Sequence, residues 1–326
     1  MGMKLPILNA AMLAALCAGR LPAADQGLLN LLMPDAKIVA GINVDQAKTT
    51  PFGAYVLNQI RAQSTQHLQQ VAALTGFDPT RDLHELLIAT NAAPGGKSGL
   101  VLARGNFDAS KIQSAATAGG GTTMTYNGVT LILDPKQAHA VAFLDSTLAA
   151  AGDVASVKGA IDRQSTPAPI SAALAVQINQ WSTTEDAWGL AAAPLSSLRP
   201  PANPANPQAA ALHNAFQNIQ QAAGGVKFGQ QIAFTGQAQA DTPENATAMA
   251  SVLQFLGSMA QMQAPNNPQA AAILSSLQVT SSGTSVNAAA TISEGQAEQM
   301  VKMQPHAAAP QSQRRVPQRR SQPDQR

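Results

Sequence analysis

The sequence predicts an α+β protein, in which an antiparallel sheet is covered by helices on one face. Three observations lead to this class: short β-branched runs that come in pairs, turn residues between the members of a pair, and capped helices between the pairs. The clearest hairpin is 122–133, because Asn127-Gly128 supplies the two positive-φ positions of a tight turn.

The first half of the chain reads as alternating strands and helices. A helix is expected from Pro51 to about Leu74, with Phe52, Val56 and Ile60 near one face and Gly76 as its end. Further helices are expected at 108–118 and 153–163, capped by aspartates. Strands are expected at 37–44, 85–90, 99–104, 122–126, 129–133, 139–144 and 147–151.

The second half looks like a looser version of the first. A strand at 231–240 precedes a helix that begins at Thr242-Pro243-Glu244 and carries a stripe with Met249, Met259 and Met262. Strands at 277–280 and 285–292 follow, and a helix is also expected at 208–223. We therefore expect two similar strand-helix-hairpin halves, at about 36–165 and 170–304, in a body that spans 25–304. The Pro-rich stretch 199–207 is either a link between two domains or, as we expect, a connection within one structure on which the following helix packs back.

The first 24 residues are typical of a secretory signal peptide. Lys4 precedes a short apolar run from Leu5 to Ala18, and small residues follow it. The run is shorter than the ~20 residues that span a bilayer. We expect cleavage after Gly19 or Ala24, export to the periplasm or beyond the cell, and no transmembrane segment in the product.

Charge and cysteine are unevenly distributed. The formal charge of +2 combines +2 from the leader, +4 from residues 305–326 and −4 from a body with 13 basic and 17 acidic residues. The single cysteine, Cys17, lies in the leader. The mature chain is then cysteine-free, which excludes disulfides, cysteine nucleophiles and thiolate metal sites.

The C-terminal 22 residues are rich in Pro and Gln and carry Arg314, Arg315, Arg319 and Arg320. Such a composition cannot recover the entropy of ordering, so a disordered, solvated tail is expected. The alternative is an electrostatic arm that makes weak contact with a polyanion. No aromatic residue is interleaved with these arginines to stack on bases.

Motifs for phosphate or metal binding are incomplete. Residues 91–98 end in Gly-Lys-Ser but lack the first glycine of a P-loop, and a strand follows where a helix is needed, so a hairpin loop is the better interpretation. His84-Glu85 has Ile88 where a zinc protease has its second histidine. The five histidines lack ligand spacing. We expect neither a metal nor a cofactor.

Arg81, Asp82 and His84 form the only compact polar trio in the sequence. They are candidates for catalysis, although a helix-starting turn with solvated charges also explains them. The surrounding stretch 76–83 reads Gly-Phe-Asp-Pro-x-x-Asp-Leu, and 105–108 reads Gly-x-Phe-Asp before the next helix. With these features the body resembles uncharacterised exported α+β proteins of acidobacterial-type genomes. That resemblance implies export and the fold, and no activity.

The sequence thus favours a non-enzymatic binding or scaffolding protein of the cell envelope. With 64 alanines the core is thin, because methyl side chains bury little area. This thin core and the Met-bearing helix leave room for an apolar groove between sheet and helices, so an apolar ligand or an envelope protein is the expected partner. The alternative is a hydrolase whose catalytic residues are dispersed in the sequence.

Overall fold

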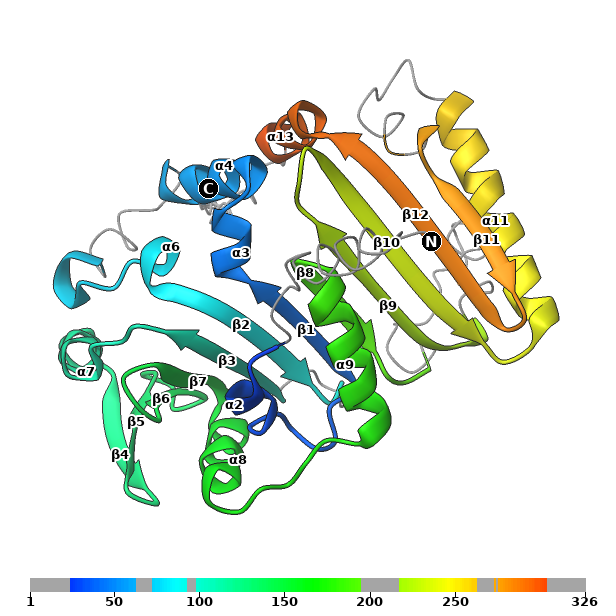
Figure 1. Cartoon of the computed structure of the whole chain (residues 1–326). Coiled ribbons are helices and arrows are strands. Elements are labelled where there is room, and N and C mark those ends of the chain that lie inside the picture. The colour runs from blue at the N-terminus through cyan, green and yellow to red at the C-terminus, as the bar shows by residue number, and fades with distance from the viewer. Residues whose placement is uncertain are drawn as a thin grey trace, which may run out of the picture.

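One antiparallel sheet runs through the protein (Figure 1). The computed structural model describes residues 24–62, 72–92, 98–194, 217–262, 273 and 275–303. Over these residues, twelve strands pair in the order β11-β12-β10-β9-β8-β1-β2-β3-β7-β6-β5-β4. This confirms the predicted α+β class.

The sheet places strands that are distant in sequence side by side. β1 pairs with β2 on one side and β8 on the other, so the middle of the sheet joins the two halves of the chain. The strands are β1 (Ile38–Asn43), β2 (Leu83–Thr90), β3 (Gly99–Gly105), β4 (Thr122–Tyr126), β5 (Val129–Leu133), β6 (His139–Phe143), β7 (Leu148–Asp153), β8 (Ala187–Ala191), β9 (Ile219–Lys227), β10 (Gln231–Ala240), β11 (Gln278–Ser282) and β12 (Ser285–Ser293).

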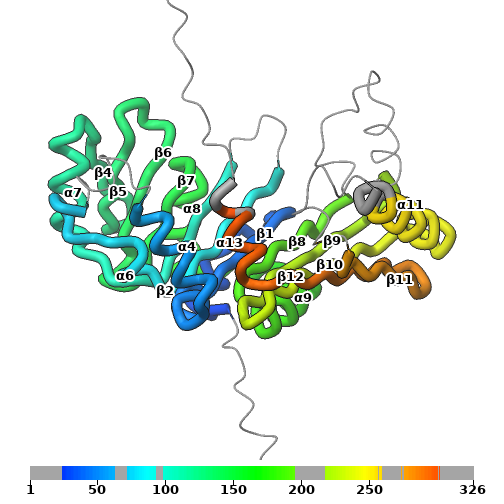
Figure 2. Tube along the Cα trace, turned by 90° about the horizontal axis from the view of Figure 1, so that it is seen from above, coloured from blue at the N-terminus to red at the C-terminus, as the bar shows by residue number. Residues whose placement is uncertain are grey.

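Helices cover both faces of the sheet, and the expectation of a single covered face was wrong (Figure 2). On β2, Leu87 packs in the cluster with α2, α8 and α9, whereas Leu86 faces α3 and α4. The helices are α2 (Gln26–Leu29), α3 (Val44–Lys48), α4 (Pro51–Ala62), α6 (Pro79–Asp82), α7 (Ala109–Ala118), α8 (Val154–Ser165), α9 (Ala172–Thr184), α11 (Pro243–Met262) and α13 (Glu294–Met303).

The predicted helix caps are present. The side chain of Asp108 accepts from the backbone N–H of Lys111 at 3.0 Å, and that of Asp153 accepts from Ser156 at 2.9 Å. Thr242 caps α11 in the same way. Asn127 and Gly128 both have positive φ in the β4-β5 turn, as predicted. Local side-chain chemistry therefore fixes these boundaries.

The helix expected at 208–223 was wrong in its second part, because β9 begins at Ile219. Gln and Ala favour helix, but β9 pairs along its length with β8 and β10, and this pairing outweighs local propensity. Gly225 also suits this strand, since a β-carbon there would overlap the Glu185 side chain. No helix was predicted from the sequence at α2, α3, α9 or α13.

Several predictions fall wholly or partly on residues outside the described ranges. They concern the leader, the Pro-rich stretch 199–207, the tail with its four arginines, residues 63–71 of the helix expected at 51–74, residues 93–97 of the loop expected at 91–98 and residues 208–216 of the helix expected at 208–223. The strand-helix-hairpin order does occur twice, as β3-α7-β4-β5 and β10-α11-β11-β12. The pairing differs, since β12 lies next to β10 but β7 and β6 separate β3 from the first hairpin. A duplication stays a prediction.

Within the described ranges, no helix is both long enough and apolar enough to cross a bilayer.

Candidate apolar ligand pocket

An apolar pocket of about 220 Å³ lies where α3, α4 and α6 meet β1 and β2. In Figure 1 these elements gather at one end of β1 and β2. The lining is hydrocarbon except for one threonine: Ile42, Val44, Ala47, Gly53, Val56, Leu57, Ile60, Pro79, Thr80, Leu83, Leu86 and Phe228.

Small residues bring α4 close to α3 and leave this space. A β-carbon at Gly53 would overlap the carbonyl oxygen of Ala47, so glycine permits the close approach. Thr50 fixes the start of α4, since its hydroxyl accepts from the Gly53 N–H at 3.1 Å while Pro51 occupies the first turn. Ile60 remains 45% exposed, so the pocket has an apolar residue in contact with solvent.

The one polar side chain of the lining is already engaged. The Thr80 hydroxyl donates to Asp78 Oδ1 at 2.6 Å and accepts from Arg61 Nε at 2.6 Å. Lys48 Nζ donates to the backbone carbonyls of Leu83 and Arg81 at 2.6 and 3.1 Å. These bonds keep polar groups around the pocket satisfied, so its interior offers apolar contact and little else.

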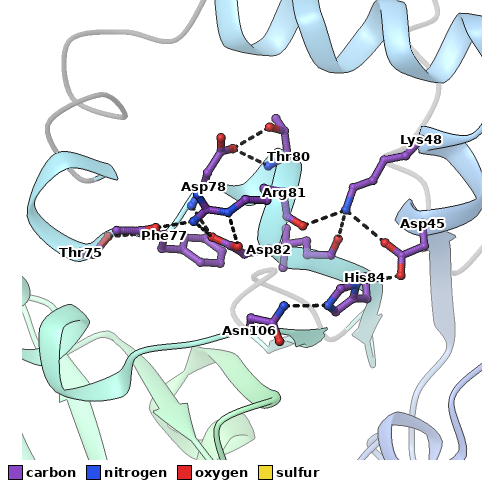
Figure 3. A network of polar contacts seen from close by, with 12 residues as sticks. Asp45, Lys48, Thr75, Phe77, Asp78, Thr80, Arg81, Asp82, His84 and Asn106 are labelled. Carbon is purple, nitrogen blue, oxygen red and sulfur yellow. Dashed lines mark hydrogen bonds and ion pairs between the residues drawn. The ribbon is translucent and has the colours of Figure 1, made fainter.

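The predicted polar trio lies beside this pocket, in a network that holds the turn before β2 (Figure 3). Arg81 Nε and Nη2 donate to the two oxygens of Asp82, both at 2.7 Å. Asp82 Oδ2 also accepts from the backbone N–H of Asp78, and Arg81 donates to the carbonyl of Gly76. The hydrogen bond from Arg81 lowers the pKa of Asp82, so this carboxyl stays ionised.

His84 is held separately from the other two members of the trio. Its Nδ1 lies 2.8 Å from Asp45 Oδ2, and its Nε2 lies 3.2 Å from Asn106 Nδ2. The tautomer protonated at Nδ1 satisfies both contacts, because it donates to Asp45 and accepts from Asn106. Both ring nitrogens thus have protein partners. Arg81 and Asp82 line a shallow depression without His84, so the three side chains do not converge on one reacting centre.

A second ionic group, absent from the sequence-based candidates, anchors the start of the body. Arg104 Nη2 donates to Asp25 Oδ1 at 2.7 Å, and Asp25 caps α2 through the Leu28 N–H. Glu85 accepts from the backbone N–H of Asp25 at 3.1 and 3.2 Å. Burial, aided by the Asp25 carboxylate, raises the pKa of Glu85 to about 7. Asp25 lies 60 positions from Glu85 and 79 positions from Arg104, so no local sequence pattern predicts these contacts.

The Met-bearing helix α11 does not line the apolar pocket. On the Met-bearing helix α11, Met249 is buried against the sheet with Ile219 and Val286. The pocket instead uses the face of α4 that carries Val56 and Ile60, both recognised in the sequence as part of one apolar stripe. A sequence signal for the pocket is the small pair Ala47 and Gly53, which lets α4 approach α3 closely.

Over the described residues, fold and pocket together define an α+β protein built on a twelve-stranded antiparallel sheet, with a mainly hydrocarbon pocket on one face. This fold is similar to that of TP0453: crystal form III gives a TM-score of 0.53 at 10% identity, covering 85% of this chain and 98% of that one. Crystal form IV gives 0.50 at 10% identity, with 84% and 95% covered. At this identity the likeness concerns the fold alone. No family model and no curated protein matches the sequence.

Proposed function

We propose that this chain is an exported, non-enzymatic binding protein of the cell envelope, whose pocket holds a small apolar molecule or one end of a longer apolar chain. The observation that carries the proposal is the pocket of about 220 Å³, lined by hydrocarbon except at Thr80. A dry apolar cavity of ~150 Å³ in another protein binds benzene, so the available space suits a ligand of this kind. The Thr80 hydroxyl has no free proton for an incoming polar group, because it donates to Asp78, and it already accepts a hydrogen bond from Arg61.

Extraction of the purified native protein with organic solvent, followed by mass spectrometry, tests the proposal. An apolar compound should be recovered from the wild type and lost from Val56→Phe, which fills the pocket from α4. Val176→Phe is the matched control, because Val176 lies on α9, is 67% exposed and is not part of this pocket. Equal recovery from both variants, or none from the wild type together with no crosslinked envelope protein, would contradict the proposal.

Export rests on the leader pattern of residues 1–24 and on the resemblance of 76–83 and 105–108 to exported proteins. The contacts of Ala24 favour cleavage after Gly19: its N–H donates to Ser182 Oγ at 3.1 Å and its methyl group is buried. Cleavage after Ala24 would remove both contacts. Amino-terminal sequencing of the protein from a periplasmic extract should begin at Arg20, and an uncleaved cytoplasmic product would refute export.

A further inference from the structure

A second recess lies on the opposite face of the sheet from the apolar pocket. It consists of two adjoining pockets of about 310 and 80 Å³ that share Gln180, Trp181 and Gln237. We call it the amide groove, and its other lining residues are Gln177, Gln221, Ala222, Ala223, Thr235, Gly236, Gln239, Gln278, Thr280, Asn287, Ala288 and Ala289.

The groove lies on the face of β10 and β12 that α11 and α13 leave uncovered. Along β10, Thr235 and Gln237 alternate with Phe234 and Ala238, which pack in the clusters beneath those helices. Helix α9 forms one wall through Gln180, and Trp181 lies at its base with 7% exposure. This face of the sheet therefore presents amide and hydroxyl groups to the groove, and α9 adds one aromatic side chain.

The lining is uncharged, although it is strongly polar. Every polar side chain along it is a glutamine, an asparagine, a threonine or the tryptophan indole. Each amide offers both donors and an acceptor. Four of these amides already form two hydrogen-bonded pairs: Gln237 Nε2 donates to Asn287 Oδ1 at 3.2 Å, and Gln177 Nε2 donates to Gln221 Oε1 at 2.6 Å. Such pairs fix the orientation of the amides and leave their second protons and lone pairs for a ligand.

The buried carboxyl of Glu185 contacts the lining of the groove. Thr235, part of the lining, donates its hydroxyl proton to Glu185 Oε1 at 2.8 Å. Glu185 is 7% exposed, and its Oε2 has no hydrogen-bond partner within the described part of the chain. Gly225 makes room for this side chain. Because the Thr235 hydroxyl donates its proton to Glu185, its oxygen can act only as an acceptor toward the groove. A hydroxyl group of a ligand could donate to it.

From this lining we infer that the amide groove binds a neutral oligosaccharide. Sugar hydroxyls donate and accept at once, which matches amides and threonine, and an uncharged lining has no attraction for a polyanion or an acidic peptide. A lipid is disfavoured, because its chain would leave the lining amides without partners. This inference is independent of the apolar ligand proposed above, since the two sites share no residue.

Calorimetric titration of the full chain with chitohexaose and with cellohexaose tests the inference, with a heparin hexasaccharide as the charged comparison. At least one neutral sugar should bind with a sub-millimolar Kd and change the tryptophan fluorescence. Gln237→Leu and Asn287→Leu should each weaken binding by about tenfold, the equivalent of about one lost hydrogen bond. Both residues are exposed, so their thermal unfolding should stay close to that of the wild type.

The matched control is Gln231→Leu, which changes an exposed glutamine of the same strand outside the groove and should leave the affinity unchanged. Val56→Phe should also leave it unchanged, which separates this site from the apolar pocket. Absence of binding to both neutral sugars at millimolar concentration, equal weakening in Gln231→Leu, or heparin binding that Gln237→Leu weakens would overturn the inference. So would binding of an uncharged peptide in place of the sugars.

Discussion

At the scale of single residues, Glu85 shows how position changes the chemistry of a carboxyl. Its pKa is raised to about 7 because burial outweighs the hydrogen bond from the Asp25 N–H and the nearby Arg104 charge. The pKa of a glutamate in an unfolded chain is ~4.3. Between these two values the folded chain binds the proton more tightly than the unfolded chain does. Glu85 therefore makes the protein less stable as pH rises through this window.

Glu85→Gln should remove that pH dependence, since the amide oxygen still accepts from Asp25 but carries no charge. At pH 8 the variant should be more stable by on the order of 1 kcal/mol, a figure reduced for solvent screening of a partly exposed group. Thermal unfolding at pH values from 4.5 to 8 measures the effect. An unchanged slope in the variant would show that Glu85 is not the group responsible.

Gly53 permits α4 to pack closely against α3, because it has no side chain. Gly53→Ala should cost about 2 kcal/mol or more in the free energy of unfolding, because the new methyl group meets the Ala47 backbone. Gly295→Ala is the matched control in α13, where a β-carbon meets no atom within 4 Å, and it should be neutral or stabilising by up to ~1 kcal/mol. Denaturant titration compares them, and equal effects would refute the packing argument.

At the scale of elements, the sequence predicted what local chemistry determines. Caps such as Asp153 and the Asn127-Gly128 turn act within four residues, so their elements were placed almost to the residue. The second part of the 208–223 helix failed, because β9 is specified by partners such as Gly225 opposite Thr235. The residues that line the pocket could not be listed from the sequence, since Val56 and Phe228 meet only after the sheet has formed.

The turn between β9 and β10 depends on a buried carboxylate. Asp186 is 1% exposed, accepts from the Phe228 N–H at 2.6 Å and lies 3.3 Å from Lys227 Nζ. Asp186→Ala should destabilise the fold by about 2–4 kcal/mol and loosen Phe228, a wall of the apolar pocket. Asp241→Ala, at an exposed aspartate before α11, should change stability by about 0.5 kcal/mol or less. Chemical denaturation of the two variants, compared at equal dependence of the unfolding free energy on denaturant, measures the difference. Similar losses of stability in both would contradict the role of Asp186 in this turn.

At the scale of the whole molecule, one sheet carries recesses of opposite character on its two faces. The apolar pocket lies beneath α3 and α4, and the amide groove lies beside α9. This separation follows from strand alternation, which sends Phe234 to one face and Thr235 to the other. Neither recess has a local sequence signature, because each draws on four or more elements.

The charge of the body and that of the tail oppose each other. Residues 305–326 carry +4 and residues 25–304 carry −4. Removal of 305–326 should abolish any binding to a heparin column at low salt, because the remaining body is acidic and repels polyanions. The salt concentration needed for elution measures this contribution. Retention equal to that of the full chain would place polyanion binding elsewhere in the protein.

The most direct test of the binding role is methyl NMR of the protein titrated with naphthalene, a neutral apolar probe. Saturable shifts are expected for the methyl groups of Val56, Leu57 and Leu86, which line the pocket, and none for Val157 and Ile161 in the cluster on the other face. Val56→Phe should abolish these shifts, and Val176→Phe should preserve them. A wild-type spectrum that stays unchanged at naphthalene saturation, or shifts confined to the other face, would contradict binding of an apolar ligand in this pocket.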